Sequence, residues 1–172
     1  MIERLYYDDS FLREFDARVE RCDPAGEKFH VILDRTAFYP TSGGQPFDTG
    51  KLNEAQVLEV VDREDGEIVH VTDRAVAAGP AHGEIDWARR FDHMQQHTGQ
   101  HLLSAAFIEL FKFQTVSFHL GRDLSTIDLA APSIAPRFLE EAERRVNEII
   151  FEDRAIAVSY ATAAQLAESG AR

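Results

Sequence analysis

The segment WARRFDHMQQHTGQHLLSAAFIELFKF, residues 87–113, decides the fold. Apolar side chains recur in it at steps of three and four residues, which predicts one apolar stripe along a helix: Leu102, Leu103, Ala106, Phe107 and Leu110. Short alternating segments precede it, and a mixture of strand and helix patterns follows it. The segment therefore predicts the point where a β-rich half gives way to an α+β half.

The half before this helix has the pattern of a small β-barrel or curled sheet. Alternating, β-branched stretches predict strands at 28–34, 55–62, 67–72 and 82–87. The turn Arg63–Gly66 separates two of them and predicts a hairpin. Several short strands joined by turns are typical of a small barrel, which we expect over residues 1–88.

The half after residue 88 predicts an α+β domain over residues 89–172. After the long helix we expect two antiparallel strands, a second helix, a strand and a short helix, at 115–120, 125–129, about 136–152, 155–160 and 162–168. Ser133 is expected to cap the second helix, and Pro136 to lie in its first turn. Gly170 would end the last helix.

Composition excludes some classes of protein. The single cysteine, Cys22, permits no internal disulfide, and there is no signal-like or membrane-spanning run, so we expect a cytoplasmic location. The net charge of −12 argues against sequence-blind binding along a phosphate backbone, although a protein that grips only the end of an RNA is not excluded. The basic pairs Arg89-Arg90 and Arg144-Arg145 are most simply solvated faces.

Three histidines, His93, His97 and His101, repeat at four-residue spacing on the predicted helix. Residues four apart share a helix face, and two imidazoles there can reach one Zn²⁺. The spacing alone is weak support, because helices also carry histidines at this spacing in surface or capping roles. A His-Glu-x-x-His metalloprotease is disfavoured, since residue 98 is Thr98.

The stretch TAFYPTSGGQPFDTG, residues 36–50, is the second signal. Its paired glycines, Gly43 and Gly44, permit positive φ and close approach to a ligand, and Gln45 and Asp48 place polar groups beside them. A tight corner of the barrel explains the same residues equally well. The stretch is not a P-loop, because no Gly-Lys-Ser/Thr follows.

Taken together, these two motifs resemble those of the free-standing alanyl-tRNA editing proteins of the AlaX type, which are related to the editing domain of alanyl-tRNA synthetase. HTGQHLLSA from His97 is similar to their first zinc motif, and TAFYPTSGGQPFDTG to their glycine-rich motif. TVSFHLG, RRVNEII and the opening RLYY are similar to further stretches, in the same order. The resemblance implies an α+β editing domain of the threonyl/alanyl-tRNA synthetase type after the barrel.

The resemblance also implies an activity and a set of roles. The activity is zinc-dependent hydrolysis of the ester that joins serine or glycine to tRNA for alanine, an error that a synthetase pocket cannot fully prevent. His97 and His101 would bind zinc, which would activate water or anchor the substrate. The remaining candidates would contact the mischarged acceptor end: Thr36 at the serine hydroxyl, Gly43, Gly44, Gln45 and Asp48 around it, and His119 as a proton donor or orienting group. His119 could equally be a core histidine.

One departure bears on the metal. The family completes its zinc site with a later Cys-x3-His motif, whereas no histidine follows His119 here and no cysteine follows Cys22. We therefore expect the chain to be part of a longer protein, with weak metal binding or a site completed by another molecule as the alternatives. The rival functions are a non-catalytic module that binds the tRNA acceptor end or a synthetase, a zinc hydrolase for another ester, and a structural domain.

Overall fold

The computed structural model describes residues 2–121, 124–158 and 160–165. Six strands form a closed, antiparallel barrel in the order β2 (Glu14–Ala25), β3 (Lys28–Leu33), β7 (Ile68–Thr72), β6 (Ala55–Asp62), β5 (Gly50–Leu52) and β8 (Gly79–Ile85). Buried Val, Ile, Leu and Phe side chains from these strands fill the interior. The short strands β1 (Glu3–Arg4) and β4 (Arg35–Thr36) pair beside the barrel, and the 3-10 turn η1 (Leu5–Tyr7) follows β1.

The predicted barrel and its hairpin are confirmed, with two corrections. The prediction omits β2, the longest strand, because its outward positions are mostly charged and only Phe15 and Val19 are fully buried along its 12 residues. The predicted strand 82–87 corresponds to β8, which begins at Gly79 and ends at Ile85. Trp87 already opens the helix, because the carboxylate of Asp86 accepts a hydrogen bond from the backbone N–H of Arg89 and caps it.

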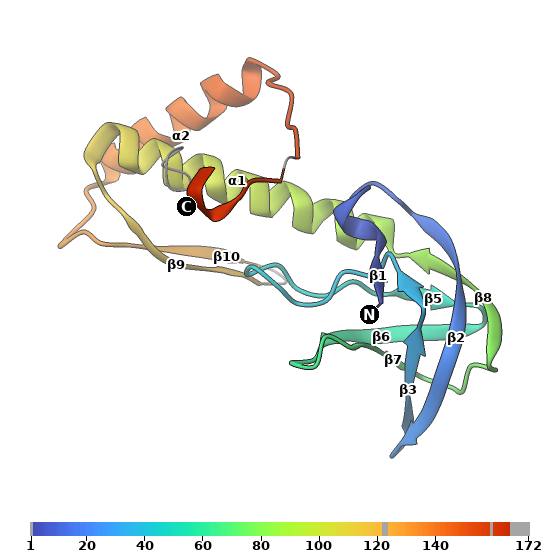
Figure 1. Cartoon of the computed structure of the whole chain (residues 1–172). Coiled ribbons are helices and arrows are strands. Elements are labelled where there is room, and N and C mark those ends of the chain that lie inside the picture. The colour runs from blue at the N-terminus through green and yellow to red at the C-terminus, as the bar shows by residue number, and fades with distance from the viewer. Residues whose placement is uncertain (1, 122–123, 159, 166–172) are drawn as a thin grey trace.

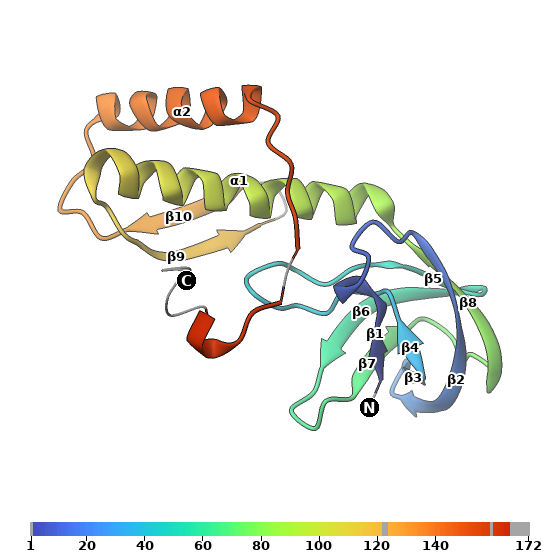
Figure 2. The same ribbon diagram turned by 45° about the horizontal axis from the view of Figure 1, so that its top comes forward.

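The long helix α1 (Trp87–Phe111) runs from the barrel into the second half of the chain (Figure 1). The hairpin of β9 (Thr115–Leu120) and β10 (Ser125–Leu129) lies along one side of α1, and α2 (Pro136–Phe151) lies along another (Figure 2). Ala106 and Phe107 of α1 pack against Ala142 of α2 in a small core. The α+β class is therefore confirmed, while the domain boundary at residues 88 and 89 stays a prediction.

The end of the chain differs from the prediction in three places. Ala135, not Ser133, precedes the first turn of α2, and no side chain caps the helix, because alanine carries no acceptor. Pro136 lies in the first turn, as predicted. The stretch 155–160 forms no strand over its described residues, and Ile156 and Val158 are exposed. The last helix begins at residue 163, and its remainder, with Gly170, lies outside the described residues.

No helix within the described ranges has both the length and the apolar character that a membrane span requires.

Candidate functional site

A cleft of about 300 Å³ opens between the barrel and the first half of α1. Three segments line it: the N-terminal stretch around η1, the loop between β4 and β5, and α1. Its lining residues are Tyr6, Ser10, Tyr39, Gln45, Arg90, Met94, His97, Thr98 and His101. The cleft thus brings the glycine-rich loop and the histidine helix together, as the sequence predicts.

His97 and His101 lie next to each other in this cleft. Their ring centroids are 4.9 Å apart and their planes differ by 21°. They are one helical turn apart, so both rings project from the same face of α1. The arrangement can present two imidazole nitrogens to one small ligand.

The loop and the helix are joined by a hydrogen bond. His97 Nδ1 lies 3.1 Å from Gln45 Oε1, and because an amide oxygen only accepts, Nδ1 carries the proton. Burial, with a smaller contribution from His101, lowers the pKa of His97 and favours the neutral ring. In the neutral ring with a protonated Nδ1, Nε2 retains a free lone pair.

The paired glycines allow the loop to approach this close. Both have positive φ, +55° at Gly43 and +80° at Gly44. A Cβ on Gly43 would lie 4.0 Å from Cε1 of His97, and a Cβ on Gly44 would come within 2.5 Å of the Phe118 ring. Any side chain at Gly44 would therefore push the loop and the β9–β10 hairpin apart.

His119 does not face the helix, which argues both against its predicted role as a proton donor or orienting group and against a core position. Phe118 contacts His97, with ring centroids 5.5 Å apart, and Phe118 pairs across the hairpin with Ile127, which faces α1. Successive residues of a strand point to opposite sides, so His119 faces away and is exposed. Phe118, not His119, is the residue of β9 that contacts the histidine pair.

Asp48 does not face the cleft either. It is fully buried and bonds to the guanidinium of Arg90, with Arg90 Nε 2.9 Å from Oδ1. Arg90 also donates to the carbonyl oxygens of Ser10 and Ala37. Asp48 thus fixes the end of the loop to α1, and Arg90, 2% exposed, is a buried clamp and not the solvated face that its basic pair suggested.

Thr36 is placed inside the barrel and outside the cleft. It is fully buried, and its hydroxyl lies 2.8 Å from Nε2 of His70, whose Nδ1 lies 3.1 Å from the carbonyl oxygen of Val31. The carbonyl requires a proton on Nδ1, so Nε2 accepts from the Thr36 hydroxyl. This placement argues against the predicted contact with a serine substrate, because the hydroxyl proton is already engaged.

Two aromatic residues of the cleft, Tyr6 and Tyr39, are absent from the predicted site. Their rings meet edge to face with centroids 5.1 Å apart. Tyr6 belongs to the RLYY opening, so the family resemblance pointed to that segment without indicating a role. The buried Nδ1 of His93, one turn before His97, has no hydrogen-bond partner among the described residues, but His93 does not line the cleft.

The chemistry of the histidine pair can be compared with what a zinc site requires. Four ligands complete a structural zinc site, and three with an open position a catalytic one. Within the described ranges, no group of three or more His, Cys, Asp or Glu side chains could hold a metal ion. His97 and His101 fit as two ligands, since Gln45 fixes the His97 tautomer that leaves Nε2 free.

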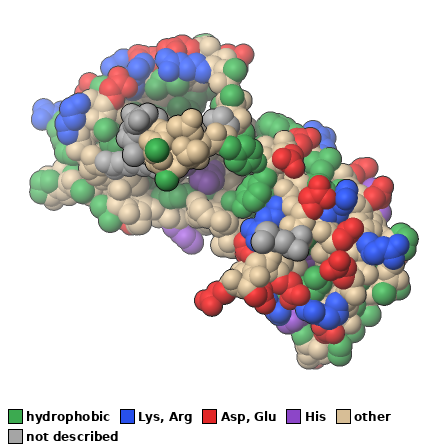
Figure 3. Space-filling model, viewed as in Figure 1, with side chains coloured by type: hydrophobic (Ala, Val, Ile, Leu, Met, Phe, Trp, Pro, Cys, Tyr) green, Lys and Arg blue, Asp and Glu red, His purple; other side chains and the backbone are tan. Residues whose placement is uncertain are grey.

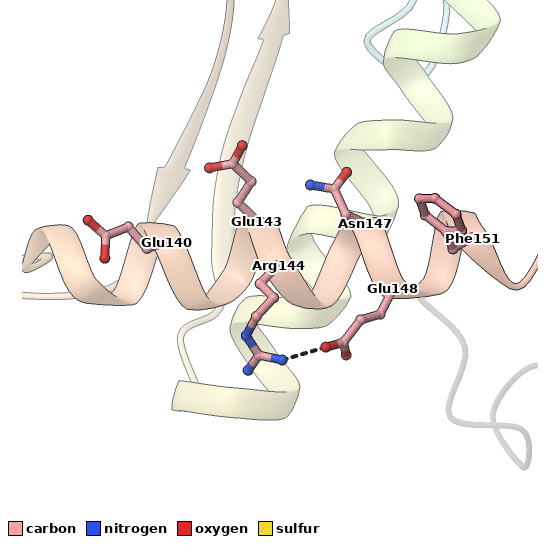
Figure 4. Close-up of a pocket in the computed structure, with 6 residues that line it drawn as sticks. All are labelled: Glu140, Glu143, Arg144, Asn147, Glu148 and Phe151. Atoms are coloured by element: carbon pink, nitrogen blue, oxygen red, sulfur yellow. Dashed lines mark hydrogen bonds and ion pairs between the residues drawn. The ribbon is translucent and has the colours of Figure 1, made fainter.

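A hollow of about 500 Å³ along α2 has a different character (Figure 4). All its lining residues come from that one helix: Glu140, Glu143, Arg144, Asn147, Glu148 and Phe151. Arg144 pairs with Glu148, and Arg145 pairs with Glu109 of α1, as expected of a solvated face. Acidic and basic side chains are also intermixed over the barrel (Figure 3). We assign no site to the hollow.

Comparison with known proteins identifies relatives of this chain. Residues 6–88 match the family described as tRNA synthetases class II (A). The chain is 40% identical to the alanyl-tRNA editing protein Aarsd1 of Mus musculus and 37% identical to AlaX-L of Pyrococcus horikoshii, over 83% and 92% of its own length. It belongs to the alanyl-tRNA editing protein family.

The extent of the match differs between members of this family. The chain spans 38% of Mus musculus Aarsd1 and 41% of AlaX-L, and thus about two fifths of these relatives. It is 36% identical to alanyl-tRNA editing protein AlaX-M of Methanosarcina mazei, over 91% of this chain and 66% of that protein. Family membership accounts for the order of the motifs along the chain.

Proposed function

We propose that this chain takes part in hydrolysing the ester that joins a wrong amino acid, serine or glycine, to the terminal adenosine of tRNA for alanine. The observation that carries the proposal is the pair of adjacent imidazoles, His97 and His101, beneath the loop of Gly43, Gly44 and Gln45. The similarity to alanyl-tRNA editing proteins supports tRNA for alanine as the tRNA. We also propose a cytoplasmic location, because tRNA is charged there.

In this proposal the residues of the cleft have separate tasks. His97 and His101 hold a zinc ion, and Gln45 keeps the His97 ring in the tautomer and orientation that binding needs. When bound, zinc supplies Lewis-acid chemistry at the ester or at the attacking water. Gly43 and Gly44 let the loop backbone approach the acyl group, and Phe118 shields one side of His97 from solvent.

A double substitution tests the proposal. His97→Ala with His101→Ala should abolish zinc binding and deacylation of seryl-tRNA for alanine. His82→Ala is the matched control, because it removes an exposed imidazole on the barrel that bonds to Asp16. Zinc content by mass spectrometry and release of serine from the tRNA are the two measurements. Full deacylation by the double variant would refute the zinc role.

A second candidate is a module that binds the tRNA acceptor end without catalysis. The incomplete set of ligands among the described residues favours it. It predicts that the chain binds mischarged tRNA but shows no turnover when zinc is supplied, and that the double substitution leaves binding unchanged. Catalytic release of serine that depends on zinc excludes this candidate.

A further inference from the structure

Three aromatic side chains form a contiguous surface where α1 begins. The ring of Trp87 contacts Phe11, with centroids 5.8 Å apart, and stacks on Phe91 with centroids 5.5 Å apart. Phe11 is 59% exposed and Phe91 is 39% exposed. The guanidinium of Arg13 lies 4.4 Å from the centroid of the Trp87 ring. Single exposed apolar side chains are ordinary on a protein surface, whereas a contiguous exposed group marks an interaction site.

This aromatic surface continues into the cleft along α1. Phe91 lies three residues before Met94 and seven before Thr98, and both of these residues line the cleft. Residues three, four and seven apart share one face of a helix, so Phe91 and the cleft wall form one stripe. His97 lies six residues beyond Phe91, which is about 9 Å along the helix axis at 1.5 Å per residue. A ligand in the cleft can therefore extend onto Phe91 along the same face of α1.

We propose that Phe11 and Phe91 bind the unpaired nucleotides that precede the terminal adenosine of the tRNA, by stacking against their bases. The inference rests on the proposed function, which puts the terminal adenosine in the cleft. The separation of about 9 Å between Phe91 and His97 along the helix corresponds to about three nucleotides of a stacked strand, at 3.4 Å each. Unpaired nucleotides next to the adenosine therefore reach the aromatic surface.

The charge of the molecule favours stacking over phosphate binding. The chain carries a net charge of −12, and acidic residues flank the aromatic surface, Asp9 and Asp92 among them. Stacking on aromatic rings needs few cations and accepts any base, because every base has a π face. Arg13 is exposed beside the rings and supplies one cation for a phosphate. An unpaired end fits this surface better than a duplex does, because its bases are free to stack on side chains.

The double substitution Phe11→Ala with Phe91→Ala tests the inference. The matched control is Phe151→Ala, which removes an exposed ring at the end of α2, outside the cleft. Two RNA probes are compared: a hairpin that carries the acceptor stem with its unpaired 3′ nucleotides, and the same hairpin with a blunt end. A seryl-adenosine analogue with an amide in place of the ester probes the cleft alone. Dissociation constants are measured for all three ligands, and thermal unfolding midpoints for all variants.

We expect the wild type to bind the hairpin with unpaired nucleotides about tenfold more tightly than the blunt hairpin, and the double variant to lose this preference. The double variant should bind the analogue like the wild type, and Phe151→Ala should bind all three ligands like the wild type. If the double variant does not fold, Phe91→Leu decides, because leucine keeps an apolar side chain against Trp87 but has no π face. It should bind the hairpin with unpaired nucleotides about fivefold more weakly.

The remaining outcomes overturn the inference. A preference that the substitutions at Phe11 and Phe91 leave intact, or that Phe151→Ala removes as well, would contradict stacking at this surface. Loss of analogue binding in the double variant would mean that the rings support the cleft and not the RNA. A wild type that binds the analogue but does not distinguish the hairpins would leave the proposed function standing and point to a protein partner for the surface. A wild type that binds none of the three ligands would overturn both proposals.

Discussion

The interior of the barrel and the cleft beside it both contain histidine, but the two histidines differ in how many of their ring nitrogens are hydrogen-bonded. In the interior, His70 is bonded through both ring nitrogens, to Thr36 and to Val31. In the cleft, Nδ1 of His97 bonds to Gln45, and Nε2 of the same ring has no partner among the described residues. The fully bonded His70 is therefore a structural group, whereas His97 retains a nitrogen that can bind a ligand in the cleft.

The same contrast runs along α1. Its first turn is anchored by Arg90, which bonds to Asp48 and to the carbonyl oxygens of Ser10 and Ala37. About two and three turns further on, His97 and His101 line the cleft. The anchored turn fixes the position of the helix relative to the glycine-rich loop. The free side chains beyond it are thereby held ready for binding at little further entropic cost.

The largest effect is expected from breaking the anchor. Arg90→Met keeps much of the side-chain volume but leaves the carboxylate of Asp48 buried and unpaired, which should lower the free energy of unfolding by about 3–5 kcal/mol. Urea denaturation measures this. Arg89→Met is the control, because Arg89 is half-buried and donates to the carbonyl oxygen of Phe47, and should lose about 1 kcal/mol. If Arg90→Met and Arg89→Met lowered the free energy of unfolding equally, Arg90 would not be the clamp that holds the loop to α1.

The next largest effect is expected from acid, which should destabilise the protein through His70 in the barrel interior. Burial lowers the pKa of His70 to about 4, below the ordinary value of 6.5, so the folded protein resists taking up this proton. The resulting contribution is complete above pH 6.5 and is lost as the pH falls toward 4, by about 3 kcal/mol. Unfolding free energies between pH 7 and pH 4.5 measure the loss.

Two variants isolate His70 in that measurement. His70→Gln should remove most of the pH dependence in this range, whatever its effect at pH 7. His82→Ala should retain it, because the pKa of His82 is raised by its bond to Asp16, and stability from that pair is lost as the pH rises, not as it falls. A pH dependence unchanged in His70→Gln would mean that carboxylates alone cause the loss.

The sequence predicts the features that depend on local periodicity. The long helix, the 55–72 hairpin and the β9–β10 hairpin follow from spacing alone, as does the shared face of His97 and His101. The phase of β9 was also readable, because Phe118 and Leu120 are its apolar positions and His119 lies between them.

Long-range pairings were not readable in this way. Asp48 and Arg90 are 42 residues apart, and Thr36 and His70 are 34 apart. Nothing in either local pattern specifies the partner, so a buried structural acid and a substrate-binding acid look alike in the sequence. Tertiary packing decides between them, because it removes both pairs from solvent.

The smallest expected effect is a difference between two glycine substitutions, one of them in the loop at the junction of the two regions. Gly44 and Gly66 have nearly equal φ, +80° and +84°, but a Cβ on Gly66 meets no atom within 4 Å. Alanine at either position therefore loses about 1–2 kcal/mol to backbone strain. Gly44→Ala should lose about a further 1–3 kcal/mol from the clash with Phe118, measured by urea denaturation.

A double-mutant cycle tests whether Phe118 causes the difference between the two alanine variants. Phe118→Leu replaces the ring that the new methyl group would meet with a shorter side chain. In this background Gly44→Ala should therefore lower the free energy of unfolding by no more than Gly66→Ala does in the wild type. If the excess persisted with Phe118→Leu, the loop would be constrained by something other than the hairpin. The close approach of the loop to His97 would then not depend on Phe118, and the two sides of the cleft could vary independently.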